Sequence, residues 1–147
     1  MVSVSALISV LKAFFDFRRN RPKLKVVPVW RDFRNNYTGE WVHGIGIHVT
    51  NLGAIAVTVE SVGFKIRGSK EILTFLLPEH PSLPYRLEPR TSITPSIPSQ
   101  VRNYQDFLAC GRAFATTQCK LTFTGSGRKF VKDIKLRIAA TKKDGSP

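Results

Sequence analysis

Histidine and cysteine are the residue types in this chain most able to do chemistry, and their spacing argues against a catalytic or metal site. His43, His48 and His80 lack the short spacings of zinc ligands, and no paired acidic motif accompanies them. His48 is expected on the solvent side of a strand. Signatures of a serine or cysteine nucleophile are also missing. The sequence therefore predicts a protein that is not an enzyme and that uses no metal and no cofactor.

The two cysteines, Cys110 and Cys119, are too few for a disulfide framework. We expect both to act as small apolar residues in a reducing compartment. A Cys110–Cys119 disulfide is the alternative if the protein is exported.

Two glycine-containing segments resemble phosphate-binding loops only superficially. Gly44-Ile45-Gly46 lies within a strand pattern, and we expect Gly125-Ser126-Gly127 to form a hairpin turn. A phosphate cradle needs a helix directly after its loop. Neither segment is predicted to have one.

Positive charge is the strongest chemical feature of the composition. The 147 residues are enough for one ordinary domain, and their net charge is +13. Residues 1–34 and residues 120–147 each carry eight bases and two acids, net +6, whereas the segment between them is nearly neutral. Such a chain favours phosphate, anionic lipid or an acidic protein surface as its partner.

The first 17 residues predict an amphipathic helix, which Pro22 ends. A narrow polar stripe of Ser5, Ser9, Lys12 and Asp16 interrupts an otherwise apolar surface. A secretory signal would carry its positive charge before the apolar segment, and a membrane-spanning helix needs about 20 apolar residues. We expect the helix to contact a membrane or a protein partner through its large apolar side chains, chiefly Leu7, Ile8, Leu11, Phe14 and Phe15.

From Leu24 onward, apolar residues recur at every second position, as in β-strands. Pro28 favours an edge strand, and a change of phase near Ser61–Gly63 predicts a β-bulge. The pattern predicts an antiparallel, immunoglobulin-like β-sandwich over residues 23–140, with one short helix before the last two strands. The predicted strands are 24–33, 41–50, 56–67, 92–97, 118–124 and 128–138, the helix is 100–110, and 141–147 form a polar tail.

Three segments carry a resemblance to a known family. Val49-Thr50-Asn51-Leu52-Gly53, then Ala56–Phe64, then Leu83–Pro89 are similar to the single immunoglobulin-like domains of uncharacterised bacterial and phage proteins. The resemblance covers residues 42–97, although Arg90 stands where that family usually has glycine. It implies a β-sandwich with a binding role and without catalysis, and it implies no particular ligand.

The two basic ends of the chain predict a shared surface. First and last strands commonly run side by side at one edge of an immunoglobulin-like sandwich, so basic residues from both ends are expected to meet there. Lysines that merely protect an edge strand from aggregation are the alternative interpretation. The predicted basic patch contains Arg18, Arg19, Arg21, Lys23, Arg31, Arg34, Arg128, Lys129, Lys132, Lys135 and Arg137.

These features together predict a binding module. Residues 1–22 would attach the β-domain to an anionic membrane surface or to a protein partner, and a second copy of the chain is one such partner. The basic residues beside the helix would place the domain in the cytoplasm, peripheral at the inner face of a membrane. The alternative is nucleic acid, bound at its phosphate backbone by the basic patch.

Overall fold

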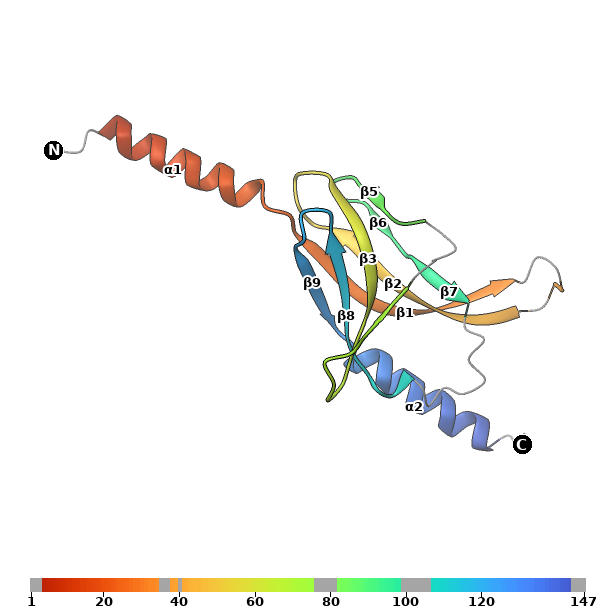
Figure 1. Ribbon diagram of the computed structural model, residues 1–147. Coiled ribbons are helices and arrows are strands. Elements are labelled where there is room, and N and C mark those ends of the chain that lie inside the picture. Colours follow the sequence, from red (N-terminus) through yellow and green to blue (C-terminus); the bar gives the residue numbers. More distant parts are fainter. Residues whose placement is uncertain (1–3, 35–37, 40, 76–81, 99–106, 144–147) are drawn as a thin grey trace.

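The protein is mainly β in the computed structural model, with antiparallel sheets and one helix near each end of the chain (Figure 1). The structure describes residues 4–34, 38–39, 41–75, 82–98 and 107–143. Two sheets share one hydrophobic core. The N-terminal helix α1 (Val4–Arg19) extends away from them, and the C-terminal helix α2 (Arg128–Lys143) packs against them.

Sheet A is built on two long strands, β1 (Leu24–Arg34) and β2 (Trp41–Asn51), which pair antiparallel over their whole length. The short strands β6 (Ser92–Ile93) and β7 (Ser96–Pro98) pair with the other side of β2. Ile45, Ile47 and Val49 are fully buried, as the alternation in β2 predicts. Among the described strands β1 forms a ladder with β2 alone, so Pro28 lies in an edge strand as predicted.

Sheet B is built around β3 (Val57–Ile66), which pairs with β8 (Cys110–Thr117). On the far side of β8 lies β9 (Thr122–Ser126), and the short strands β4 (Ile72–Thr74) and β5 (Tyr85–Leu87) pair with the other side of β3. The register between β3 and β8 shifts between Val59 and Ser61, close to the predicted bulge. Because of this shift, Val59 and Val62 both face the core.

A buried asparagine fastens the turn between the two sheets. The Asn51 side chain is fully buried. Its amide nitrogen donates to the carbonyls of Ile55 (2.8 Å) and Leu87 (3.1 Å), and its oxygen accepts from the Gly53 amide (2.9 Å). These bonds satisfy polar groups that would otherwise be costly to bury.

The strand predicted over residues 128–138 is wrong, because this segment is helix α2. Phe130, Val131 and Ile134 are buried and follow helical spacing, whereas Leu136 is 62% exposed. The alternation of Ile134, Leu136 and Ile138 suggested a strand. Helical hydrogen bonding and the docking of Phe130 into the core outweigh that short pattern. The helix also continues through residues 141–143, where a polar tail was expected.

Two further boundaries differ from the sequence predictions. Cys110 begins strand β8, although a helix was predicted through this residue, and residues 100–106 of that helix lie outside the described part of the chain. Strand β8 itself was not predicted. β9 begins at Thr122 rather than at residue 118, because the turn between β8 and β9 occupies residues 118–120.

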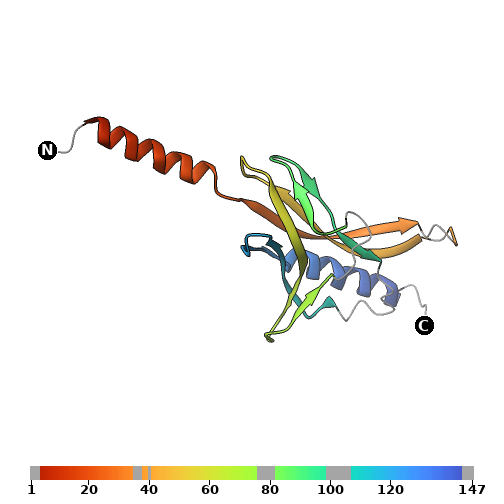
Figure 2. The ribbon, with the colours of Figure 1, turned by 45° about the horizontal axis from the view of Figure 1, so that its top comes forward.

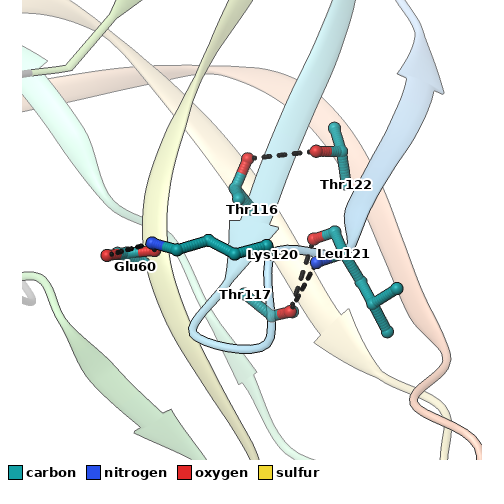
Figure 3. Close-up of polar contacts among 6 residues, drawn as sticks. All are labelled: Glu60, Thr116, Thr117, Lys120, Leu121 and Thr122. Atoms are coloured by element: carbon teal, nitrogen blue, oxygen red, sulfur yellow. Dashed lines mark hydrogen bonds and ion pairs between the residues drawn. The ribbon is translucent and has the colours of Figure 1, made fainter.

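Polar contacts hold this turn against β3 (Figure 3). Lys120 Nζ lies 2.7 Å from Glu60 Oε2, and the Thr117 hydroxyl both donates to the Leu121 carbonyl and accepts from the Leu121 amide, at 3.3 Å. Lys120 has a positive φ of 61°. The ion pair therefore ties a tightly turned backbone to the neighbouring strand.

The first strand β1 and the last strand β9 lie side by side, whereas the segment 128–138, which was predicted to be the last strand beside β1, is helix α2. A Cβ atom on Gly125 would clash with the carbonyl of Val26, so β9 approaches β1 more closely than any side chain would allow. Gly127 approaches the carbonyl of Gly111 in the same way. These two glycines let the end of β9 pass between β1 and β8 before α2 begins.

Candidate functional site

Helix α1 presents an apolar surface that nothing in the described structure covers. Every residue of α1 is exposed, and the helix projects from the β-sheets in both views (Figures 1 and 2). The predicted contact residues Leu7, Ile8, Leu11, Phe14 and Phe15 are 48–65% exposed. The sequence prediction did not include Phe17 in this set, although it is 59% exposed. We call these six residues the apolar face.

The opposite side of α1 is the predicted polar stripe. Ser5 and Ser9 lie one turn apart, and the Ser9 hydroxyl donates to the Ser5 carbonyl at 2.9 Å. Such a bond satisfies a serine side chain within a helix. Lys12 and Asp16 continue the stripe toward the C-terminal end of the helix.

Basic residues gather where α1 ends. Arg18 and Arg19 lie in the last turn, where positive charge interacts favourably with the helix dipole. The Arg18 guanidinium lies 4.9 Å from the ring centroid of Phe14, and that of Arg21 lies 4.4 Å from the ring centroid of Phe17. The cations therefore border the apolar face directly. Lys23, which leads into β1, is also exposed.

The two basic ends of the chain do not merge into the predicted patch. Arg18–Lys23 lie beside α1, while the C-terminal bases lie on α2 at the far end of the sheets (Figure 1). Arg137 contacts β1 through the ring of Trp30, at 5.2 Å from its centroid. Arg31 follows Trp30 and so points to the other face of sheet A, where its guanidinium donates to the Thr94 carbonyl at 3.4 Å. The side chain of Arg34 lies outside the described residues.

The C-terminal bases are solvent-exposed on a helix rather than on an edge strand. Because these residues are helical, protection of an edge strand does not explain them. Asp133 is the acid among them. The exposed set is Arg128, Lys129, Lys132, Lys135 and Arg137.

Three basic residues of the nearly neutral middle segment were missed by the sequence analysis. Lys65, Arg67 and Arg112 line a cleft together with Arg128. Lys65 and Arg112 are register partners on β3 and β8. The alternation of Lys65 and Arg67 was a visible signal, but Arg112 could be joined to them only once β8 was known to be a strand.

Of the three histidines the structure describes only the side chain of His48, because that of His43 and the whole of His80 lie outside the described residues. His48 is half-buried on the outer side of β2, and its Nδ1 lies 2.9 Å from the Thr94 hydroxyl. Cys110 is buried and Cys119 is exposed, and both are free thiols. Cys110 is the first residue of β8 and Cys119 lies in the turn after its last residue, about 20 Å or more apart at the rise of a strand, so this fold does not allow them to pair.

The described residues contain neither a cluster of metal-binding side chains nor a helix that could span a membrane. No three His, Cys, Asp or Glu side chains in this part of the chain could hold a metal ion together. No helix among the described residues combines the length and the apolar character required to cross a bilayer.

The sequence matches no protein-family model, and no curated protein is significantly similar to it.

Proposed function

We propose that this protein is a non-enzymatic binding module that attaches to an anionic membrane surface through α1. The observation that carries the proposal is the complete exposure of α1, because the six large apolar side chains of its apolar face stay 48–65% exposed. The core is assembled from the two sheets and α2 without any contribution from α1. A contiguous apolar surface of this kind marks a site of interaction.

Charge and length favour a lipid surface over a protein partner. Sixteen helical residues span about 24 Å, which is less than the roughly 30 Å of a bilayer core, so the helix would lie flat at the interface. Arg18, Arg19, Arg21 and Lys23 would then face the headgroups. Each base near an anionic leaflet contributes about 1 kcal/mol.

We further propose that the two sheets form an immunoglobulin-like sandwich. The strand order β1-β2-β6 corresponds to the A-B-E order of that fold, and β3-β8-β9 corresponds to C-F-G. The close approach of β1 to β9 agrees with this assignment. Its exposed loops would be the surfaces that bind a second partner at the membrane, on the cytoplasmic side.

The decisive experiment separates apolar contact from charge. The Leu7→Glu/Leu11→Glu variant removes two residues of the apolar face, and Ser5→Glu/Ser9→Glu makes the same charge change on the polar stripe. We expect wild type and the serine variant to sediment with phosphatidylserine vesicles, and the leucine variant to stay in solution. All three should share one melting temperature by circular dichroism, because α1 is outside the core.

Two results would reject the membrane proposal. One is equal vesicle binding by both variants, which would leave the apolar face without a role. The other is a wild-type protein that ignores vesicles but forms oligomers by light scattering, with monomers only in the leucine variant. That result would show that α1 binds a second copy of the chain.

Nucleic acid is a second candidate, favoured by the exposed bases on α2. Sequence-independent phosphate contacts would give an affinity that falls steeply with salt. Lys129→Glu/Lys132→Glu/Lys135→Glu should then abolish the gel shift of an oligonucleotide of any sequence. A shift that this variant retains at physiological salt would eliminate the candidate.

A further inference from the structure

A cleft of about 870 Å³ opens where β3 and β9 end and where β8 and α2 begin. This is within the usual range for a small-molecule site. β3 contributes Lys65 and Ile66, and the following turn contributes Arg67 and Ser69. The remaining lining comes from β8, the end of β9 and the first residue of α2, namely Gly111, Arg112, Thr124, Gly125, Ser126, Gly127 and Arg128.

Four basic residues and no acidic residue line this cleft. Lys65 and Arg112 lie directly opposite each other on paired strands, which is an unfavourable arrangement for like charges. On its other side Arg112 is the register partner of Ser126 on β9. Only Gly127 separates Ser126 from Arg128, the first residue of α2. Among the described residues, none of the four basic side chains has a carboxylate within ion-pair distance, in contrast to Lys120 and its partner Glu60.

The backbone adds to the positive potential. Gly125-Ser126-Gly127 was not expected to bind phosphate, because no helix was predicted after it. In the structure, helix α2 begins at the residue that follows, Arg128. The Ser126 hydroxyl accepts from the Arg128 amide at 3.3 Å. The next amides of the first turn have no carbonyl partner within the helix. This turn contains no acidic residue to offset the helix dipole.

We propose that this cleft binds a multiply phosphorylated small molecule. Arginine guanidinium groups suit phosphate because they donate two parallel hydrogen bonds, and the cleft is lined by three arginines from three elements: Arg67 from the turn after β3, Arg112 from β8 and Arg128 from α2. Ser69, Thr124 and Ser126 supply hydroxyl donors. A bound polyanion would relieve the repulsion between Lys65 and Arg112. The cleft is separate from α1, so phosphate binding can be tested independently of membrane attachment.

The basic residues of β3, β8 and β9 are confined to the cleft, which favours a compact ligand over a nucleic acid strand. The next row on the same face of sheet B after Lys65–Arg112–Ser126 is Gly63–Phe114–Thr124, which carries no charge. An extended phosphate backbone would need basic residues to continue along the surface. Across these three strands the basic residues end with this row, whereas those farther along α2 belong to the exposed set that favours the nucleic acid candidate.

The test titrates the 147-residue chain with inorganic tripolyphosphate and measures the heat of binding by calorimetry at 150 mM salt. We expect saturable binding of one equivalent, which Lys65→Gln and Arg112→Gln each weaken about tenfold. Lys25→Gln removes an equal charge from an exposed strand position outside the cleft, and should change the affinity less than threefold. Amide signals of residues 126–129 should shift on titration, and the melting temperatures of all variants should match.

A second arm separates the two sources of such a phosphate group. Inositol hexakisphosphate tests a free ligand, and vesicles carrying a bisphosphorylated inositol lipid test a headgroup, against phosphatidylserine vesicles of equal charge. Loss of binding in Arg112→Gln in either arm, but not on phosphatidylserine, supports the cleft. Three results overturn the proposal: no tripolyphosphate binding by wild type, an equal loss in Lys25→Gln, or an oligonucleotide that binds in the cleft and that tripolyphosphate cannot displace.

Discussion

The ring of Phe130 on α2 stacks on the ring of Phe64 on β3, with centroids 5.6 Å apart and planes inclined by 21°. The ring of Trp30 on β1 also contacts Phe130, with centroids 5.2 Å apart and planes inclined by 30°. One aromatic side chain from the C-terminal helix thus joins a strand of each sheet. The helix that carries the exposed bases is therefore part of the core, and its orientation depends on this contact.

Replacing Phe130 should destabilise the whole domain. Phe130 is 3% exposed, so Phe130→Ala leaves a cavity between the sheets and should lower the free energy of unfolding by about 3–5 kcal/mol. Leu136→Ala, on the exposed side of the same helix, should change it by less than about 0.5 kcal/mol. Urea denaturation measures both. Equal effects of the two substitutions would mean that α2 is not docked.

Removing the buried side-chain amide of Asn51 should also destabilise the domain. Asn51→Ala leaves the carbonyls of Ile55 and Leu87 without their donor, and we expect a loss of about 2–3 kcal/mol in the free energy of unfolding. Asn20→Ala, in the exposed segment after α1, is the matched control and should be neutral. Thermal unfolding followed by circular dichroism compares them. A neutral Asn51→Ala would show that water replaces the side chain at no cost.

Stability should fall in alkaline solution because of Cys110. Burial raises the pKa of the Cys110 thiol from 9.0 to about 11. Between these values the unfolded chain loses the proton while the folded protein keeps it, so the free energy of unfolding decreases as pH rises, by at most about 1.4 kcal/mol per pH unit. Denaturation series from pH 8 to pH 11 should show this slope reduced in Cys110→Ala and kept in Cys119→Ala. An unchanged slope in Cys110→Ala would contradict the assignment.

The bases beside α1 should set its affinity for anionic lipid. Arg18→Gln and Arg21→Gln should each weaken partitioning onto phosphatidylserine vesicles about fivefold, which corresponds to about 1 kcal/mol. Raising the salt concentration should reduce the difference between these variants and wild type. Lys132→Gln, on α2 at the other end of the molecule, should bind as wild type does. Equal weakening by all three would point to net charge rather than to a site.

Local patterns were sufficient for several elements. The polar stripe of Ser5, Ser9, Lys12 and Asp16 predicts α1, since only a helix brings residues at these steps onto one face. The strict alternation of Ile45, Ile47 and Val49 predicts β2 and its buried side. In both cases the spacing of residue types is sufficient to predict the element, because one face of it has the same polarity along its whole length.

Tertiary structure alone decided the C-terminal segment and the cleft. The residues around Ile134 fit both a strand and a helix, and the choice depended on where Phe130 could be buried, next to residues far away in the chain. Lys65, Arg112 and Arg128 are likewise distant in sequence, and strand register and the start of α2 bring them together. Contacts between distant residues depend on how whole elements pack, and a local pattern contains no information about that packing.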